Sequence, residues 1–231
     1  MAFSGVRVRS VVSICIMYLC AVLELVRPAC DLCSTCDSCS YPCDRCPWNS
    51  WTCFHAANMG YLYVLRWLHE HGCPWDEATC NAAAGKGQLA MLKWARAHGC
   101  PWDAGAFYRA AKGGHLAVLR WLHELGCPWD ADACSAAAEV GNLDVLRWLR
   151  EHGCPWDDDT CNAAVEAGHL KVLQWAQQHG CPCNLQSAQQ HARSGLAVSR
   201  KPERVTEVLQ WLQQLQLSES RAPPPPGGSA L

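Results

Sequence analysis

The sequence predicts an all-α protein, a helix-turn-helix solenoid of about six stacked repeats. The first observation is a fixed step of 27 residues between glycines, at Gly72, Gly99, Gly126, Gly153 and Gly180. The second is the same step in two tryptophan series: Trp75, Trp102, Trp129 and Trp156, and Trp67, Trp94, Trp121, Trp148 and Trp175. The third is the helical spacing of apolar residues within each unit. Self-similarity at a short fixed period is typical of repeat proteins, in which each unit contacts only its neighbours.

Each unit is predicted to form two short helices, as the unit around Asp76 illustrates. Asp76 stands where an N-cap residue should, because its carboxylate can accept hydrogen bonds from the free N–H groups of the first turn. The Ala-rich stretch EATCNAAA follows, and Gly87 ends it. The second helix is LAMLKWARAHG, which Gly99 ends as a glycine in the left-handed region would. One face of this helix is expected to be buried, and it consists of Leu89, Met91, Leu92, Trp94 and Ala95.

The two tryptophan series are expected to have different surroundings. We expect the series in the second helices to be buried and to pack neighbouring units together, since one unit cannot cover its own apolar face. Burying one such side chain contributes about 1.5–3 kcal/mol. The loop series, which begins at Trp75, either fills space in the loop or is partly exposed.

The stretch from Ala110 to Cys127 has the pattern AAxxGHLxVLxWLxxxGC. This pattern resembles the ankyrin repeat, in which the corresponding stretch is Ala-Ala-x-x-Gly-His-x-x-Val-Val-x-x-Leu-Leu-x-x-Gly-Ala. The matching residues are Gly114, His115, Leu116, Val118, Leu119 and Gly126, and Trp121 takes a Leu position. The resemblance covers about residues 46–215. It implies ankyrin-like repeats with short loops in place of β-hairpin fingers, because ankyrin repeats usually have about 33 residues.

The sixth unit departs from the period. Its VLQWL motif, Val208 to Leu212, lies nine residues later than the 27-residue step requires. We expect an inserted loop from Ser199 to Arg204. Residues 216–231 are predicted to form a disordered Pro- and Gly-rich tail, whose four prolines could also serve as a polyproline ligand.

The repeat cysteines take positions that suit small or medium hydrophobic residues. Those in the first helices are Cys53, Cys80, Cys134 and Cys161, with Phe107 in the same position, and those in the loops are Cys73, Cys100, Cys127, Cys154 and Cys181. Equivalent residues of stacked helices lie about 8–10 Å apart, whereas a disulfide needs Cα atoms within about 7 Å. The recurring His-Gly-Cys offers only two candidate metal ligands per unit, so we expect neither a disulfide ladder nor a metal site in the repeats.

The N-terminal residues 1–29 do not fit the repeat. Val11 to Val26 is an apolar stretch that follows Arg7 and Arg9, which is the pattern of a signal peptide or a signal anchor. It is short for a helix that spans a membrane, which needs about 20 residues. A buried capping helix and a disordered start are the alternatives.

Residues 30–45 form a Cys-rich, low-complexity segment that runs into the first repeat. The cysteines of this cluster are Cys30, Cys33, Cys36, Cys39, Cys43 and Cys46. Cys-x-x-Cys spacing suits tetrahedral zinc, but a standard zinc module separates its two pairs by a dozen or more residues. Zinc binding, disulfide bonding and no specific role therefore all remain open.

In a repeat protein, function is expected at exposed positions that differ between units. One first-helix column reads Phe54, Asn81, Tyr108, Ser135 and Asn162. Neighbouring columns add His55, Arg109, Lys112, Glu139 and Glu166. The resemblance implies that these side chains line the concave face, where partners of ankyrin proteins usually dock. Tyr and Arg are favoured at binding hot spots.

Composition and motifs bound the function. The net charge is −2, and Lys and Arg are spread along the chain, so no footprint for nucleic acid is present. No phosphate loop or nucleophile elbow occurs. We therefore predict a non-enzymatic scaffold that binds another protein and needs no cofactor. The alternative is a metal-binding or redox-responsive protein that uses the N-terminal Cys cluster.

The cysteines also bear on the compartment. Unpaired thiols in the repeats favour the cytoplasm or the nucleus. Residues 1–29 would instead anchor the chain in a membrane or direct its secretion if they act as a targeting segment. Any membrane association is expected only through residues 11–26.

Overall fold

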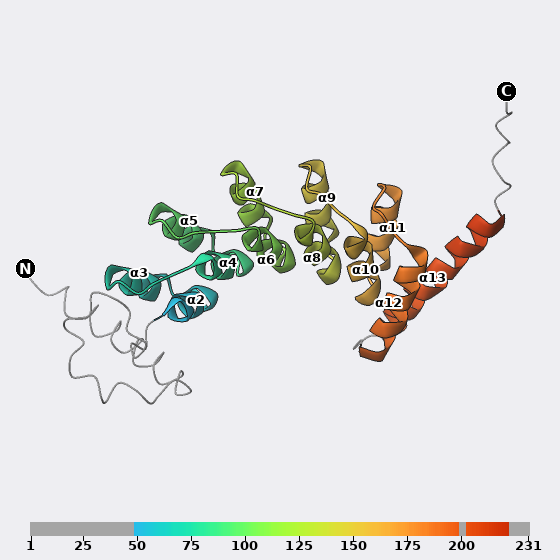
Figure 1. Ribbon diagram of the computed structural model, residues 1–231, viewed down its shortest axis with the longest axis horizontal. Helices are drawn as coiled ribbons and strands as arrows, with labels where there is room; N and C mark the ends of the chain where they lie inside the picture. Colours follow the sequence, from blue (N-terminus) through green and yellow to red (C-terminus); the bar gives the residue numbers. More distant parts are fainter. Residues whose placement is uncertain (1–48, 199–201, 222–231) are drawn as a thin grey trace, which may run out of the picture. The chain divides into compact units, whose positions relative to one another are not determined.

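The computed structural model describes residues 49–198 and 202–221 (Figure 1). Within these residues the chain forms 12 α-helices and no strand. The helices are α2 (Ser50–Met59), α3 (Leu62–Glu70), α4 (Glu77–Gly85), α5 (Leu89–Ala97), α6 (Gly105–Gly113), α7 (Leu116–Glu124), α8 (Asp132–Val140), α9 (Leu143–Glu151), α10 (Asp158–Glu166), α11 (Leu170–Gln178), α12 (Leu185–Val198) and α13 (Pro202–Arg221). Even-numbered labels up to α12 mark the first helix of a pair, and odd-numbered labels mark the second.

The described residues fall into two compact units. The first comprises residues 49–110 and 117–127, and the second comprises residues 111–116, 128–198 and 202–221. In the first unit α2 packs against α3 and α4, and α4 packs against α5. In the second unit α10 packs against α8, α11 and α12, and α12 packs against α13. In the first unit α2 contacts the next first helix, α4, and in the second unit α8 contacts α10 and α10 contacts α12. This stacking of helix pairs confirms the predicted all-α solenoid.

The first helices α4, α6, α8 and α10 begin one or two residues after the Asp that ends each Cys-Pro-Trp-Asp motif. In α4 the backbone N–H of Ala78 donates to Asp76 Oδ1 at 3.1 Å, which confirms Asp76 as the predicted N-cap. Asp103 Oδ1 accepts in the same way from the N–H of Gly105 at 3.0 Å. Asp157 precedes α10 without such a side-chain bond.

The second helices end in a Schellman motif. Gly99 has φ +83°, its N–H donates to the carbonyl of Arg96 at 3.1 Å, and the N–H of Cys100 donates to the carbonyl of Ala95 at 3.0 Å. This pair of bonds satisfies two carbonyls that the helix end leaves open. It recurs at each Gly-Cys pair, namely 72–73, 126–127, 153–154 and 180–181. The predicted left-handed glycine is therefore confirmed in every loop.

The core consists of small and aliphatic side chains. Ala and Cys line the first helices, and Leu and Val fill the second helices, as in Leu92 and Leu119, which are fully buried. The prediction that the second-helix tryptophans are buried is wrong for most of them. Trp148 is 7% exposed, but the other four are half-buried. Leu and Val already fill the space between helices, so the indole rings lie at its edge.

Four of these indoles, those of Trp94, Trp121, Trp148 and Trp175, pack against a loop indole. The rings of Trp75 and Trp94 meet edge to face at 5.7 Å, and those of Trp156 and Trp175 at 5.9 Å. Such edge-to-face pairs contribute about 0.5–1.5 kcal/mol beyond the area they bury. The loop tryptophans are half-buried. Both alternatives from the sequence therefore apply, because each indole fills space in its loop and is also partly exposed to solvent.

The last helix pair is longer than the others. α12 has 14 residues and α13 has 20. Residues 199–201 of the predicted inserted loop lie outside the described residues, but Pro202 begins α13, so 202–204 are helical rather than loop. Proline is tolerated in the first turn of a helix, where its missing N–H has no partner to lose. α13 ends at Arg221, beyond residue 215, and residues 222–231 are not described.

No helix in the described part of the chain is both long enough and apolar enough to cross a membrane. The apolar stretch from Val11 to Val26 lies outside that part.

Candidate functional site

The first helix of the first unit carries an exposed group of aromatic rings, which we call the α2 aromatic cluster: Trp51, Phe54 and His55. The Trp51 and Phe54 rings stack with centroids 4.7 Å apart and planes at 8°. His55 meets both rings edge to face, at 5.2 and 5.5 Å. Spacings of three and four residues place all three on one helix face. Trp51 is 60% exposed, so the cluster presents apolar surface to solvent.

Phe54 and His55 were predicted from the sequence as binding residues, but Trp51 was not. A signal was present, because Trp51 belongs to neither 27-residue tryptophan series. The same position in the following units is small or acidic, namely Ala78, Gly105, Asp132 and Asp159.

Two of the predicted binding residues are not on the surface. Asn81 is 8% exposed and Asn162 is 7% exposed. The amide nitrogen of Asn81 donates to Asp103 Oδ1 at 2.9 Å, so this side chain ties α4 to the N-cap of the next pair. The expectation that both asparagines face solvent is therefore corrected. The Asn81 side chain therefore contacts the following loop and is not available to a binding partner.

The remaining predicted residue pair of the first unit lies on α6. Tyr108 is half-buried and Arg109 is exposed. A Cβ added at Gly85 would lie 3.0 Å from the Arg109 Cβ, so the backbone of α4 approaches α6 closely at this point. Arg109 thus emerges beside the end of α4.

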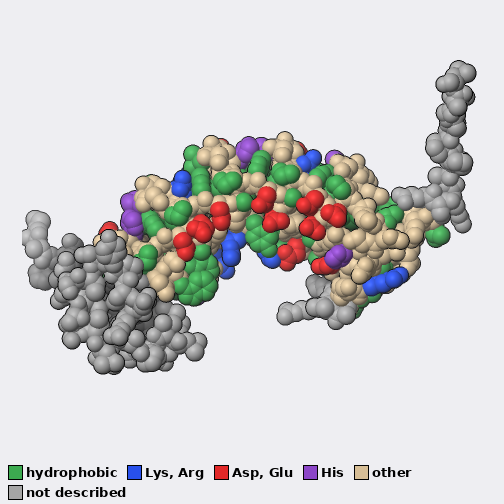
Figure 2. Space-filling view, viewed as in Figure 1, with side chains coloured by type: hydrophobic (Ala, Val, Ile, Leu, Met, Phe, Trp, Pro, Cys, Tyr) green, Lys and Arg blue, Asp and Glu red, His purple; other side chains and the backbone are tan. Residues whose placement is uncertain are grey.

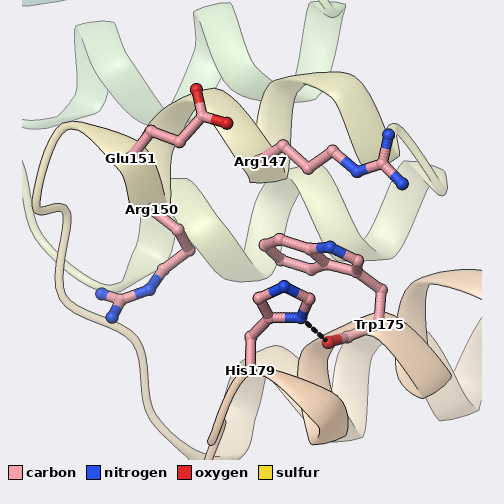
Figure 3. Close-up of a pocket in the computed structure, with 5 residues that line it drawn as sticks. All are labelled: Arg147, Arg150, Glu151, Trp175 and His179. Atoms are coloured by element: carbon pink, nitrogen blue, oxygen red, sulfur yellow. Dashed lines mark hydrogen bonds between the residues drawn. The ribbon is translucent and has the colours of Figure 1, made fainter.

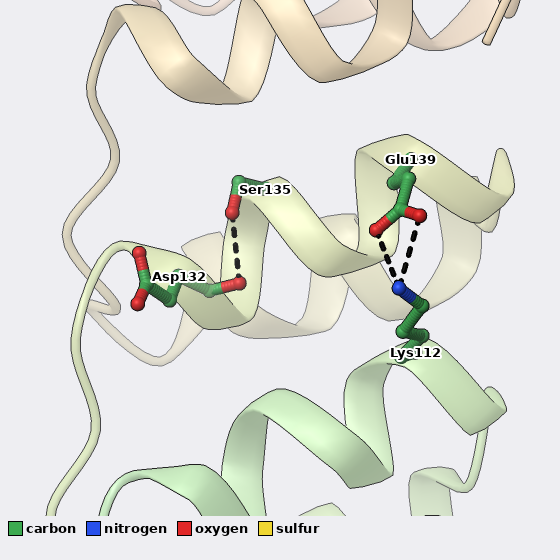
Figure 4. A network of polar contacts seen from close by, with 4 residues as sticks. All are labelled: Lys112, Asp132, Ser135 and Glu139. Atoms are coloured by element: carbon green, nitrogen blue, oxygen red, sulfur yellow. Dashed lines mark hydrogen bonds and ion pairs between the residues drawn. The ribbon is translucent and has the colours of Figure 1, made fainter.

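In the second unit two of the predicted carboxylates, Glu139 and Glu166, each pair with a basic side chain of an adjacent first helix. Lys112 Nζ lies 2.8 Å from Glu139 Oε2 and 2.9 Å from Oε1 (Figure 4). Glu166 accepts from His191 Nδ1 in the same way. Ser135 Oγ donates to the carbonyl of Asp132 in its own helix at 3.0 Å (Figure 4). This part of the first-helix surface is charged and paired, whereas the part on α2 is aromatic.

Acidic side chains gather at the N-terminal ends of the first helices, and Figure 2 shows acidic side chains exposed on the surface. The described acidic residues at these ends are Asp76, Glu77, Asp103, Asp130, Asp132, Asp157, Asp158 and Asp159. Carboxylates at a helix N-terminus complement the open N–H groups and the helix dipole. Their position therefore follows from helix formation and does not by itself indicate a binding site.

The loop thiols have a structural role that the sequence analysis missed. The Cys100 thiol donates to the backbone carbonyl of Asp76, with Sγ and O 3.4 Å apart, and so links one loop to the N-cap of the preceding pair. The equivalent links join Cys73 to Asn49, Cys127 to Asp103, Cys154 to Asp130 and Cys181 to Asp157, at 3.3–3.5 Å. Burial raises the pKa of Cys127 to about 12. A thiol held protonated in this way acts as a donor rather than as a nucleophile.

The histidines of the His-Gly-Cys motifs close the second helices. His98 Nδ1 donates to the carbonyl of Trp94 at 2.8 Å, and its ring lies 4.4 Å from the Trp94 ring. Residues 49–198 and 202–221 contain no group of three His, Cys, Asp or Glu side chains placed to hold a metal ion. The predicted metal-binding cluster from Cys30 to Cys46 lies outside these residues.

A surface pocket of about 520 Å³ lies between α9 and α11 (Figure 3). Its lining residues are Arg147, Arg150, Glu151, Trp175 and His179. Most of its polar groups already have partners within the fold. Arg150 donates to the carbonyl of Cys154 and lies over another ring, and His179 Nδ1 donates to the carbonyl of Trp175 at 2.8 Å. The pocket therefore offers one guanidinium, Arg147, beside an exposed indole edge.

No protein-family model matches the sequence, and no curated protein matches it. Among solved structures, the chain is similar to the crystal structure of the human ASB11 ankyrin repeat domain. The sequence identity is 14%, the TM-score is 0.49, and the match covers 67% of this chain and 82% of that chain.

The chain's own repeat gives the more direct description. The repeats before the last helix pair step by 27 residues, and each contains two short helices and turns at two glycines with positive φ. The first helices pack against one another along each compact unit. These features fit an ankyrin-like repeat protein with short loops between its helix pairs.

Proposed function

We propose that this chain is a non-enzymatic scaffold that binds another protein through its first-helix surface, with the α2 aromatic cluster as the main contact. Ankyrin repeat folds generally mediate protein–protein interaction. The observation that carries the proposal is the 60% exposure of Trp51 on top of a stacked Phe54 ring. Large aromatic residues are enriched at binding hot spots because they bury much area at little conformational cost.

The energetics favour the aromatic cluster over the loops. The loop groups already make hydrogen bonds inside the fold, so a partner would have to displace them. A partner that covers the Trp51 indole instead removes apolar surface from water, which contributes about 1.5–3 kcal/mol. The stacked geometry of Trp51 and Phe54 exists before binding, so little ordering is needed.

The other surface residues would supply selectivity. Tyr108 and Arg109 lie on α6 in the first unit, two repeats after Phe54 and His55 and in the same columns as those residues. Lys112, Glu139 and Glu166 present charges of both signs in the second unit. Exposed charges of this kind mainly steer association and disfavour partners with the wrong charge pattern. Ser135 adds a hydroxyl, whereas Asn81 and Asn162 are excluded because they are buried.

The proposal is tested by proximity labelling with the full-length chain and two matched variants. Trp51→Ala with Phe54→Ala removes the stacked pair, and Tyr63→Ala removes an aromatic side chain that is 77% exposed on the second helix α3. We expect the double variant to lose a set of labelled proteins that the Tyr63→Ala variant retains. Binding of a purified member of that set should weaken by at least about tenfold, as expected for a hot spot of about 1.4 kcal/mol or more.

Two results would contradict the proposal. One is the same loss of labelled proteins in the Trp51 and Phe54 double variant and in Tyr63→Ala, since that would show that removing any exposed aromatic side chain has this effect. The other is unchanged labelling in the Trp51 and Phe54 variant whose thermal unfolding matches the parent chain. A Tyr108→Ala, Arg109→Ala variant then tests the next position along the same surface.

The alternative function, metal binding or redox response at Cys30 to Cys46, stays a prediction from the sequence. The zinc content of the purified chain, with and without residues 30–46, tests it directly.

A further inference from the structure

The loop that enters the last helix pair differs from the earlier Cys-Pro-Trp-Asp loops at two positions, 183 and 184. Where earlier loops read Cys-Pro-Trp-Asp, this loop reads Cys-Pro-Cys-Asn, so Cys183 takes the place of an indole. Among the ten cysteines in the described part of the chain, Cys183 alone is not buried. A side chain that elsewhere packs against a neighbouring ring has here become a thiol that solvent reaches.

Cys183 belongs to a group of three thiols in the second unit. Cys161, on α10, is fully buried, and its side chain lies beside those of both Cys181 and Cys183. Cys181 is 6% exposed, and its Sγ lies 3.3 Å from the carbonyl oxygen of Asp157. The group therefore combines one accessible thiol with a buried thiol in direct contact.

The contact has an electrostatic consequence. The hydrogen bond from Cys161 stabilises the Cys183 thiolate and lowers the pKa of Cys183, although burial opposes this effect. The same contact, together with burial, raises the pKa of Cys161. Accessible thiols with increased thiolate character, next to a second thiol, are the ones that oxidants attack first.

We propose that Cys183 and Cys161 form a peroxide-sensitive thiol pair, in which Cys183 reacts with a hydroperoxide and Cys161 resolves the product as a disulfide. The site would take hydrogen peroxide or a small alkyl hydroperoxide. It goes beyond the proposed binding function and uses none of its residues.

The two steps balance. The Cys183 thiolate attacks one peroxide oxygen, an S–O bond forms, the O–O bond breaks, and the other oxygen takes up a proton and leaves as water or an alcohol. Sulfur loses two electrons and the peroxide gains two. The Cys161 thiol then attacks the Cys183 sulfenic acid, an S–S bond forms, and the S–O bond breaks. The hydroxyl leaves as water with the Cys161 proton.

The other units provide internal comparisons. Cys80 and Cys100 also lie beside each other, with the Cys80 Sγ 4.0 Å from the backbone carbonyl oxygen of Cys100, but both side chains are fully buried. In that repeat, Trp102 occupies the loop position that is equivalent to Cys183. The same thiol contact without access to solvent should therefore resist peroxide.

The test begins with native labelling of the full-length, reduced chain. N-ethylmaleimide is added at neutral pH, and the labelled cysteines are located by peptide mass spectrometry. We expect Cys183 to react at least about tenfold faster than Cys80, Cys100 or Cys154, because burial excludes the reagent from those thiols. Cys161→Ala should slow the labelling of Cys183 at neutral pH, since the stabilising hydrogen bond is lost.

The second step treats the same chain with hydrogen peroxide and maps the disulfides. We expect a linked peptide pair that joins Cys161 to Cys183, present in Cys181→Ser and absent in Cys183→Trp. Cys183→Trp carries the residue that earlier loops have at this position, and its thermal unfolding is compared with that of the parent chain.

Three outcomes would overturn the inference. These are labelling of Cys183 no faster than that of the buried thiols, oxidation of Cys183 to sulfinic acid without any link, and a link from Cys183 to the N-terminal cysteines instead of Cys161. Formation of the Cys161 to Cys183 link in the reduced, peroxide-treated parent chain, together with its loss in Cys183→Trp, supports it.

Discussion

Each repeat contains two tight turns, and they differ in what surrounds their glycines. The inner turn joins the two helices of a pair and contains Gly60, Gly87, Gly114, Gly141 or Gly168. The outer turn leads from one pair to the next and contains Gly72, Gly99, Gly126, Gly153 or Gly180. All of these glycines have positive φ, between 68° and 87°. The outer glycines have nothing within 4 Å of an added Cβ, whereas four inner ones would place that atom within 3.0 Å of the next pair.

The difference shows that one backbone conformation serves two purposes. In the outer turn glycine is needed only for its left-handed conformation, which lets two helix carbonyls be satisfied. In the inner turn glycine also lets the following helix pair approach. Substitution at the two turns therefore separates the cost of conformation from the cost of contact.

The largest effect is expected for Gly168→Ala. A Cβ at this position would lie 3.0 Å from the backbone C of Arg204 and N of Val205, so α13 would have to shift. The positive φ costs about 1–2 kcal/mol and the overpacking about 1–3 kcal/mol more. We expect the free energy of unfolding to fall by about 2–5 kcal/mol, as measured by urea denaturation.

The matched control is Gly153→Ala, which has φ +87° but open space around the added Cβ. It should lose only the conformational part, about 1–2 kcal/mol. Equal losses in the two variants would mean that the inner turn does not set the approach of the next pair.

A smaller effect is expected at the end of the outer turn, where the first helices are capped. Asp76→Ala removes an acceptor for the N–H of Ala78 and should destabilise the chain by about 1 kcal/mol. Asp157→Ala should cost less, because Asp157 makes no side-chain cap bond and its buried Oδ1 has no partner. Thermal unfolding of the two variants checks this order, and a larger loss for Asp157→Ala would contradict it.

The outer turn was largely predictable from the sequence, whereas the inner turn was not. Asp76 and Gly99 follow local rules, because a cap and a left-handed glycine act within a few residues of their own helix. Gly87 could be read only as a helix break. Its counterparts contact side chains of the next pair, and such contacts depend on how the pairs stack, which a repeat period does not specify.

The site residues divide in the same way. Phe54 and His55 were found because their column varies, but that rule also selected Asn81 and Asn162, which are buried. A column can vary while some of its members reach the neighbouring loop. Burial of the second-helix tryptophans was overestimated because hydrophobic spacing does not show that Leu and Val already fill the core.

A pH-dependent effect is expected at the inner turn of the second unit. His169 covers Gly141, and burial lowers the pKa of His169 below its ordinary value of 6.5, with help from Arg204 and against a backbone hydrogen bond at Glu139. The unfolded chain therefore binds this proton more readily than the folded chain does. The stabilisation is present above pH 6.5 and is lost as the pH falls below 6.5 toward the folded pKa.

His169→Gln tests this contribution, because Gln88 holds the same position against Gly60 in the first unit. The free energy of unfolding of the parent and the variant is compared by urea denaturation between about pH 5 and pH 8. We expect the difference between them to change with pH in the stated direction. A constant difference would show that the His169 proton does not distinguish the folded chain from the unfolded chain.

The smallest effect is expected for Lys112 and Glu139, which link consecutive first helices just before the inner turn. The two side chains are 42% and 47% exposed, so solvent screens their 2.8 Å contact. A double-mutant cycle with Lys112→Met and Glu139→Gln should give a coupling of about 0.2–1 kcal/mol, and added salt should reduce it. A larger coupling free energy that salt does not change would show that this ion pair stabilises the chain in the same way as the packed contacts of the inner turn. A weak coupling means instead that the contact between Lys112 and Glu139 can be broken at little cost in stability. A charged group of a partner can then pair with either side chain. A binding surface requires such exchangeable contacts, whereas the packed contacts of the inner turn cannot be exchanged in this way.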